Sequence, residues 1–292
     1  MTIFIGLTFF HENLSVAYRF IRRNEQRCIA LCFLQKAYLQ ESEGGDTIKI
    51  QYVGHAAVFV ESDLKIIIDP YLKGKGREGF SRYNPNAALS VEDVERIGLD
   101  LIMLTHGHGD HFGQTFELLE KTDAKLVASN RVCDFVEKKI DKKRLLRNEP
   151  HEELNIGKFK VLAREAKHKH GLEGFGGDLL GWLAYKRYTP CGTNMGYLIS
   201  AEAKTIYHSG DTYIVPDVCN PDIAFLSMDG FRTLNEKEAL EAIRDIKPKT
   251  VVPIHYKVFN GEKIVKKVRR TIEREEVNVL LREMEYGEVM EM

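Results

Sequence analysis

The sequence predicts a protein of the α/β class, and two observations support this prediction. Short apolar runs typical of buried strands alternate along the chain with segments of helical periodicity, several of which begin with a capping residue. The 292 residues, of which 43% are hydrophobic and 29% charged, suffice for a sizeable core and are typical of an ordinary globular protein. Periodicity alone supports no description finer than α/β.

The first 46 residues differ from the rest of the chain. Residues 13–40 have helical periodicity, and residues 41–46 have the polar, glycine-containing composition of a linker. This segment could be an extra helix, a membrane-surface or partner contact, or a loosely ordered tail. We expect residues 1–46 to be an accessory extension without chemistry.

Three short strands follow the extension, at residues 48–53, 57–61 and 65–69. Asp69-Pro70 ends the third strand and opens a loop at residues 73–86 that is rich in glycine and basic residues. Ser90-Val-Glu-Asp93 is a capping box, which predicts a short helix that ends at Gly98.

The most informative stretch is the loop after the next predicted strand, at residues 101–104. Three histidines and one aspartate fall within six residues, as His106, His108, Asp110 and His111. Alternate side chains of an extended chain point the same way, so His106 and His108 can converge on one point. Asp110 and His111 lie at the start of a predicted helix, at residues 111–121, and point to a second, adjacent position. Imidazole and carboxylate are ligands of zinc, iron or manganese, so the loop predicts a metal site.

The second half of the chain continues the alternation of strands and helices. We expect strands at residues 125–128, 159–166, 194–200, 203–208, 223–228 and 250–254, and helices at residues 130–140, 236–246 and 262–275. Asn130 and Asn235 are the expected helix caps. The strand at residues 159–166 leads to His168, and His170 has the same parity, so it is a rival candidate ligand. Residues 171–190 combine glycines with aromatic residues, which suits either a substrate lid or a hairpin.

Five motifs, which occur along the chain in the family's order, resemble those of the metallo-β-lactamase superfamily. His106-x-His108-x-Asp110-His111 is similar to the family's histidine motif. The other four are the strand that ends at Asp69, Ala166-Lys-His168, Ile206-Tyr-His-Ser-Gly-Asp211-Thr and Val251-Val-Pro-Ile-His255-Tyr. The resemblance covers residues 47–290. Tyr52-Val-Gly-His55-Ala is most similar to the branch of small metal-dependent hydrolases that includes ascorbate-6-phosphate lactonase-like proteins and uncharacterised Zn-dependent hydrolases.

The resemblance implies a fold and a set of metal ligands. The fold is a four-layer αββα sandwich at residues 47–292, with the metals at one edge between the sheets. His106, His108 and His168 would hold one ion, Asp110, His111 and His255 the other, and Asp211 would bridge both. The family's Ala-x-His spacing favours His168 over His170. The cofactor is expected to be two divalent ions, with zinc favoured by the histidines and manganese or iron also permitted by the aspartates.

Four residues, Asp69, His55, His208 and Asp110, have expected roles other than metal binding. Asp69 is expected to orient a histidine ligand rather than to bind metal itself. His55 and His208 each lie beside a motif, and together with Asp110 they are the candidate catalytic groups, for proton donation to the leaving group or for substrate binding. A structural, hydrogen-bonding role is the alternative for both histidines.

The expected function is that of a metal-dependent hydrolase. Two divalent ions about 3.5–4 Å apart can share a hydroxide that attacks a small ester, lactone or phosphoester. The basic loop residues Lys73, Lys75 and Arg77 would suit an anionic small-molecule substrate. The alternatives are a phosphodiesterase or nuclease acting on RNA or nucleotides, and a catalytically silent metal-binding scaffold. The net charge of −1 argues against a nucleic-acid partner.

The remaining expectations concern location. The five cysteines, at positions 28, 32, 133, 191 and 219, are odd in number and unpatterned, as is typical of reduced intracellular thiols. No apolar run has the length of a membrane span, and residues 2–10 lack the flanking features of a secretory signal. We therefore expect a cytoplasmic protein without a transmembrane segment.

Overall fold

The computed structural model describes residues 47–73, 84, 86–169, 191–201, 203–214 and 217–292. All of them belong to one compact unit, Glu43–Met292. The N-terminal extension at residues 1–46, most of the basic loop after Lys73, His170 and the segment 171–190 lie outside the described residues. The division of the chain after residue 46 therefore stays a prediction.

The described residues form two sheets of seven strands each. The first has the order β14-β1-β2-β3-β4-β5-β6, and the second has the order β13-β12-β11-β10-β9-β8-β7. The strands of the first sheet are β1 (Lys49–Gly54), β2 (Ala57–Glu61), β3 (Lys65–Ile68), β4 (Leu101–Met103), β5 (Lys125–Ala128), β6 (Leu145–Arg147) and β14 (Val289–Glu291). Those of the second are β7 (Glu153–Ile156), β8 (Phe159–Glu165), β9 (Met195–Ala201), β10 (Lys204–His208), β11 (Ile223–Ser227), β12 (Thr250–Ile254) and β13 (Leu280–Leu281).

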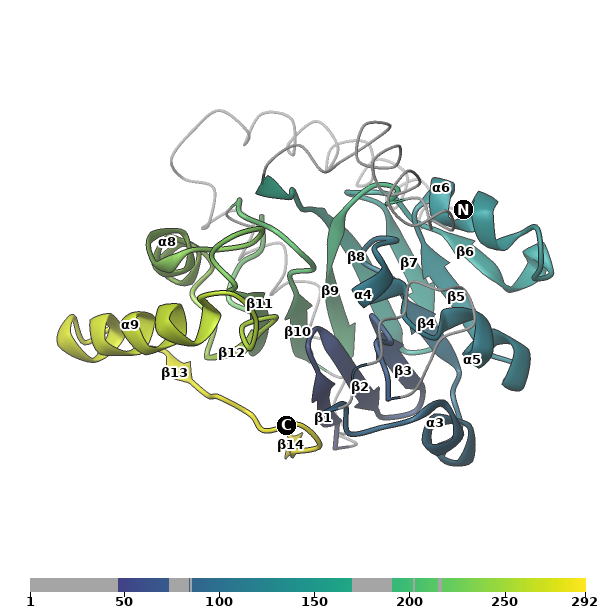
Figure 1. Cartoon of the computed structure of the whole chain (residues 1–292), viewed down its shortest axis with the longest axis horizontal. Helices are drawn as coiled ribbons and strands as arrows, with labels where there is room; N and C mark the ends of the chain where they lie inside the picture. Colours follow the sequence, from purple (N-terminus) through teal and green to yellow (C-terminus); the bar gives the residue numbers. More distant parts are fainter. Residues whose placement is uncertain (1–46, 74–83, 85, 170–190, 202, 215–216) are drawn as a thin grey trace, which may run out of the picture. The chain divides into compact units, whose positions relative to one another are not determined.

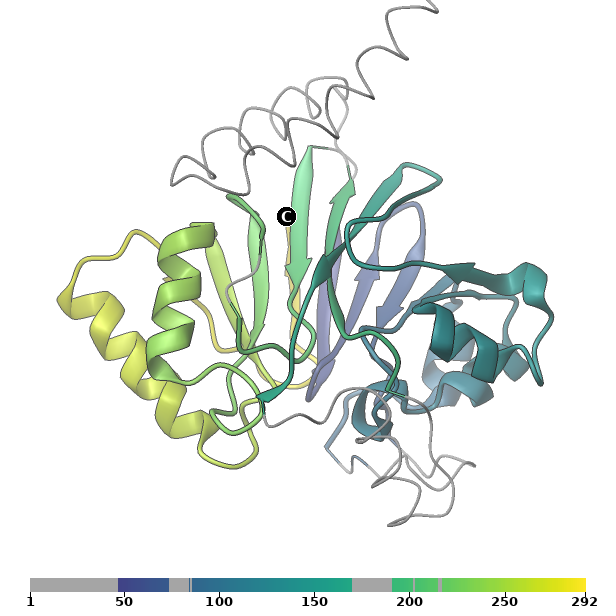
Figure 2. The ribbon, with the colours of Figure 1, turned by 90° about the horizontal axis from the view of Figure 1, so that it is seen from above.

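Helices cover the outer face of each sheet. On the first sheet lie α3 (Val91–Ile97), α5 (Thr115–Lys121) and α6 (Asn130–Val136), and on the second lie α8 (Glu236–Ile246) and α9 (Gly261–Arg274). Two short elements complete the described set, α4 (Gly109–Phe112) and a 3-10 helix at Lys142–Arg144. Figure 2 shows the yellow-green pair α8 and α9 on one side of the sheets and the blue and teal helices on the other. The expected four-layer αββα sandwich is confirmed (Figure 1).

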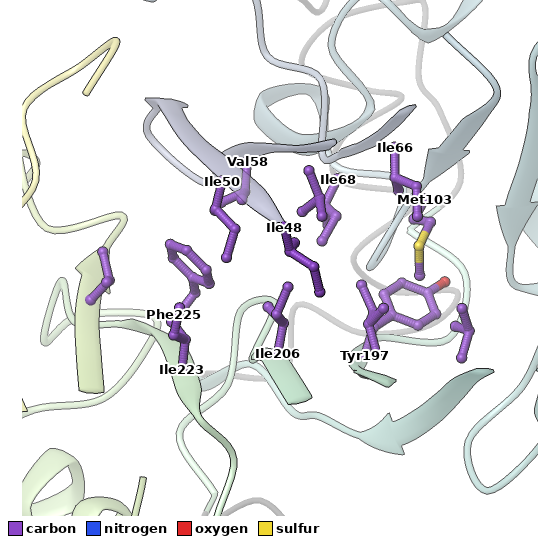
Figure 3. Close-up of a cluster of buried hydrophobic side chains, with 14 of the residues drawn as sticks. Ile48, Ile50, Val58, Ile66, Ile68, Met103, Tyr197, Ile206, Ile223 and Phe225 are labelled. Atoms are coloured by element: carbon purple, nitrogen blue, oxygen red, sulfur yellow. The ribbon is translucent and has the colours of Figure 1, made fainter. Parts of the chain in front are cut away.

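The main core lies between the two sheets, where apolar side chains of facing strands meet (Figure 3). β3 shows why its sequence is a continuous apolar run. Successive side chains of a strand point to opposite faces. Ile66 and Ile68 therefore face the other sheet, whereas Ile67 packs under the helices, and all three are fully buried.

Local sequence signals placed most elements correctly. The capping boxes at Ser90 with Asp93 and at Asn235 with Glu238 are both present. The predicted strands at residues 57–61 and 250–254 and the helix at residues 236–246 have the observed bounds. The short strands β6, β7, β13 and β14 were not predicted, because two to four residues carry too little periodicity to stand out.

Two helix predictions need correction. The helix expected at residues 111–121 is broken into α4 and α5 at Gly113, whose φ is 46°. A Cβ at this position would lie 2.1 Å from the carbonyl oxygen of Pro70, so only glycine fits at this break, where the chain passes close to Pro70. The helix expected to be capped by Asn130 and to reach residue 140 has Ser129 at its N-cap, without a side-chain cap, and ends at Val136.

The cysteines and the helices bear on the expected location. Cys133 and Cys191 are buried and form no disulfide, whereas Cys219 is disulfide-bonded, so the prediction of five reduced thiols is wrong at Cys219. Among the described residues, no helix combines the length and apolar character that crossing a membrane requires.

Candidate metal centre

The candidate metal ligands gather because seven strands point toward the same edge of the molecule. β3 and β4 are parallel, as are β10, β11 and β12. β1 shares the direction of β3 because both are antiparallel to β2, and β8 shares that of β10 because both are antiparallel to β9. Residues that follow the carboxyl ends of these strands can meet, as in other open α/β sheets. They are His55, Asp69, the loop from Thr105 to His111, His168, Asp211 and His255.

The first group of ligand atoms consists of His106, His108 and His168. The ligating nitrogens of these three residues lie within 4.8 Å of one another. His106 Nε2 and His108 Nδ1 are 2.9 Å apart, and the hydroxyl of Thr105 lies 3.0 Å from the far nitrogen, Nδ1, of His106. All three imidazoles therefore present a nitrogen to one point.

The second group consists of Asp110, His111 and His255, with His55 beside them. One atom from each of the four lies within 4.8 Å of the others. The Oδ2 atom of Asp110 is 3.4 Å from His255 Nε2 and 3.2 Å from His55 Nε2. α4 begins at Gly109 with His108 as its N-cap, so the short helix separates the two groups while keeping them adjacent.

Asp211 connects the two groups. Its Oδ1 lies 3.3 Å from His111 Nε2, and its Oδ2 lies 3.6 Å from His168 Nε2 and 3.7 Å from His255 Nε2. Gly210 makes this approach possible, because its φ is 57° and a Cβ there would lie 2.6 Å from the carbonyl of Met195 and 2.9 Å from Thr105 Cβ. The structure thus brings all seven predicted ligands together.

The residues present fit a metal ion better than a network of hydrogen bonds. Among the described residues, Asp211 Oδ1, His111 Nε2 and His255 Nε2 are buried and make no hydrogen bond. Buried polar atoms are almost always hydrogen-bonded, and a shared metal ion would give these three atoms a common partner. An imidazole-rich set with two carboxylates is the donor set of zinc, iron or manganese centres.

The pKa shifts differ between the two groups of candidate ligands. Burial, followed by the neighbouring histidines, lowers the pKa of His106 and brings that of His108 to about 3. Burial alone would lower the pKa of His255 too, but Asp211, Asp110 and Asp229 outweigh it and raise the pKa to about 10. Burial would raise the pKa of Asp211, yet His255 and His111 hold it well below its usual value. His106 and His108 are therefore neutral imidazoles, whereas His255 lies among ionised carboxylates.

Asp69 lies behind His111, as expected of a residue that orients a ligand. Its Oδ2 is 2.7 Å from His111 Nδ1, on the side of the ring away from Asp211. Thr105 donates its N–H to Asp69 Oδ1 at 2.8 Å and its hydroxyl to Oδ2 at 2.7 Å. The fully buried carboxylate therefore joins the ends of β3 and β4.

Three residues of the centre have backbone conformations that non-glycine residues rarely adopt. His55, Asp69 and His255 have φ values of 57°, 49° and 56°. Such conformations cost on the order of 1–3 kcal/mol each and persist only where surrounding contacts hold them. One of these contacts is direct, because the N–H of His255 donates to the carbonyl of His55 at 2.8 Å.

The two candidate catalytic histidines have different surroundings. His55 reaches the ligand set through Asp110, its ring centroid lies 3.9 Å from that of His255, and its side chain is 11% exposed. Burial, and then His255, lower its pKa to about 4. His208 is fully buried, its Nε2 donates to the carbonyl of Ala56 at 2.8 Å, and its Nδ1 accepts from the N–H of Gly210 at 3.2 Å. Because both ring nitrogens are occupied by backbone, we assign His208 a structural role and retain His55 as a candidate catalytic group.

Sequence reasoning missed one residue of the centre, Asp229. It is fully buried, and its Oδ2 lies 3.2 Å from His255 Nδ1. The available signal was its place directly after the buried strand at residues 223–228, which resembles the placement of Asp69 after β3.

Comparisons with known proteins agree with this geometry. Residues 65–256 match the family model described as the beta-lactamase superfamily domain. A UPF0173 metal-dependent hydrolase of Thermococcus kodakarensis is 32% identical over 221 residues, which cover 73% of this chain and 86% of that protein. Another, from Bacillus cereus, is 34% identical over 219 residues, with coverage of 73% and 87%.

Solved structures share the fold at lower identity. Igni18, a metallo hydrolase of the archaeon Ignicoccus hospitalis, has a TM-score of 0.64 at 24% identity, over 85% of this chain and 99% of that one. CmlA, a diiron β-hydroxylase of Streptomyces venezuelae, has a TM-score of 0.60 at 15% identity, over 86% of this chain and 55% of that one. A hydrolase and a hydroxylase share this fold, so the fold does not select a reaction. The sequence relatives are more specific, and with the family model they show that this chain belongs to the metallo-β-lactamase superfamily and, within it, to the UPF0173 metal-dependent hydrolases.

Proposed function

We propose that this metal-dependent hydrolase acts on a small ester, lactone or phosphoester through a centre of two divalent metal ions. His106, His108 and His168 would hold one ion, and Asp110, His111 and His255 the other. The observation that carries the proposal is the position of Asp211, whose two oxygens face histidines of both groups at 3.3–3.7 Å. A carboxylate shared in this way suits a pair of adjacent cations, and zinc is our first choice because imidazole dominates the set.

The metals would supply an activated water and charge stabilisation, since two adjacent divalent ions lower the pKa of a bound water and offset developing negative charge. The chain's own residues keep the ligands in place. Asp69 fixes the His111 ring from behind, and Asp211 is kept ionised by its histidine neighbours. His55 lies beside Asp110 at the partly exposed side of the second group, where it could exchange a proton with a leaving group.

A small substrate is favoured over RNA by the surface of the second sheet. The longest of the described helices, α9, has many lysines and arginines, but several of them are neutralised by nearby carboxylates. Lys267 pairs with Glu236 at 3.2 Å and Arg269 with Glu283 at 2.7 Å. Together with the net charge of −1, these pairs leave little reason to expect the basic stripe that backbone phosphates require.

Metal analysis followed by a substrate panel tests the proposal. We expect purified protein, depleted with a chelator and reloaded with zinc, manganese or iron, to bind two equivalents per chain. It should then hydrolyse at least one compound among simple lactones, aryl esters and phosphomonoesters. Asp211→Asn is the sharpest variant, because it keeps the size of the side chain while removing the charge that both groups face. It should lose turnover together with part of the bound metal.

The other outcomes separate the competing functions. Turnover of bis-(p-nitrophenyl) phosphate or cyclic nucleotides, without turnover of lactones or esters, would favour a phosphodiesterase. Two bound equivalents with no turnover on any compound would favour a scaffold. A chain that binds no metal under any loading condition would contradict the two-metal centre itself.

A further inference from the structure

Asp229 occupies a loop that is built around its own carboxylate. Oδ1 accepts three backbone N–H groups, from Phe231 at 2.7 Å, Arg232 at 2.8 Å and Thr233 at 3.0 Å. The N–H of Asp229 donates to the hydroxyl of Thr233 at 2.9 Å. Three hydrogen bonds thus hold this fully buried side chain in one orientation, and a fourth holds the backbone of Asp229, just after the end of β11.

The other oxygen, Oδ2, faces the ring of His255. It lies 3.2 Å from His255 Nδ1, and both atoms are buried. Neither atom has a hydrogen-bonding partner among the described residues, so each can satisfy the other. β11 and β12 are parallel neighbours with Ser227 opposite Ile254, so Asp229, two residues after β11, follows near His255, which comes directly after β12.

We propose that Asp229 is a positioning residue that fixes the ring of His255 and thereby sets the metal affinity of the second group. The proposal rests on the metal centre proposed above. A carboxylate at Nδ1 holds an imidazole in the tautomer that leaves Nε2 free to bind metal, and it raises the basicity of the ring. His255 Nε2 is the atom that faces Asp110 and Asp211, at 3.4 and 3.7 Å.

Asp69 and Asp229 then have the same role, each orienting one histidine from the end of a strand in a different sheet. Asp69, after β3, lies 2.7 Å from His111 Nδ1, and Asp229, after β11, lies 3.2 Å from His255 Nδ1. Both supported rings belong to the second group of ligands. His255 has a φ of 56°, a conformation that persists only where surrounding contacts hold it, and the approach of Asp229 to its ring is one such contact.

Asp229→Asn tests the positioning of His255 while keeping the hydrogen bonds that hold the loop. The amide oxygen can still accept the three N–H groups, whereas the amide nitrogen would replace the carboxylate oxygen that faces His255 Nδ1. Competition titrations of the metal-free protein with Zn²⁺ and a chromophoric chelator give the affinity of each bound equivalent. We expect one equivalent to weaken by about 10–100-fold, the effect typical of losing such a partner, with the thermal midpoint of the metal-free protein close to that of the wild type.

Thr233→Val is the matched control, because it removes the bond from the Asp229 N–H but leaves the carboxylate and His255 unchanged. It should lower the thermal midpoint of the metal-free protein while keeping both zinc affinities within about twofold. Unchanged zinc affinity in Asp229→Asn would overturn the proposal. Equal weakening in both variants would also overturn it, since the loop rather than the carboxylate would then be responsible. A wild-type chain that binds no zinc would instead remove the metal centre on which the proposal rests.

Discussion

Replacing His208 with alanine should destabilise the protein without removing a catalytic group. The ring is fully buried between the sheets and connects them, because its Nε2 donates to Ala56 of the first sheet while Gly210 donates to its Nδ1. Loss of the buried ring costs about 2 kcal/mol, and leaving two buried backbone groups without partners adds about 1 kcal/mol each. We therefore expect the free energy of unfolding to fall by about 4 kcal/mol, with roughly half of the loss recovered in His208→Gln, whose amide nitrogen can restore the bond to Ala56.

His55→Ala should instead reduce turnover strongly and stability only slightly. Among the described candidate ligands, His55 contacts Asp110 at 3.2 Å, and its side chain is partly exposed, so we expect a loss of about 1 kcal/mol in stability. If it exchanges a proton during turnover, kcat should fall by about 10²-fold. Urea unfolding of the metal-free proteins measures the first quantity, and turnover on a substrate found in the panel, with bound metal quantified, measures the second. A His208→Ala protein as stable as the wild type, fully metallated and inactive, would refute the structural assignment of His208.

Three further predictions follow from the centre and its supporting loops. Removing Asp211 altogether, as Asp211→Ala, should reduce the bound metal below the wild-type value, and elemental analysis that finds two full equivalents would count against the shared carboxylate. Gly113→Ala should cost more than about 3 kcal/mol in urea unfolding, because φ is 46° and the new Cβ would lie 2.1 Å from Pro70 O. Gly157→Ala, also at positive φ but 3.6 Å from its nearest neighbour, should cost only about 1 kcal/mol, and equal losses would contradict the argument. The carboxylates raise the pKa of His255 to about 10 despite its burial, so His255 should be protonated near neutral pH in the metal-free protein. Metal binding must release that proton, so the metal affinity should rise with pH. Calorimetry in two buffers of different ionisation enthalpy should detect the released proton.

The local signals in the sequence were sufficient for most of the architecture. Capping boxes and apolar runs depend on residues a few positions apart, so Ser90, Asn235 and the run before Asp69 could be interpreted without knowledge of the fold. The edge strands β13 and β14 are stabilised by partners far along the chain, and their own two or three residues contain little signal. The break at Gly113 has the same origin, since it depends on the approach of Pro70.

The sequence by itself suggested which residues could bind metal. The spacing of His106, His108, Asp110 and His111 indicated a metal site, and the resemblance to the metallo-β-lactamase superfamily implied that His168, Asp211 and His255 complete it. Only the tertiary structure decided what each neighbouring residue does. His55 and His208 both lie beside a motif, yet one reaches Asp110 and the other is held by backbone groups of both sheets. Asp229 belongs to none of the motifs. Its contact with His255 can be seen only once β11 and β12 are placed side by side, because hydrogen bonds depend on distance in space and not on position in the sequence.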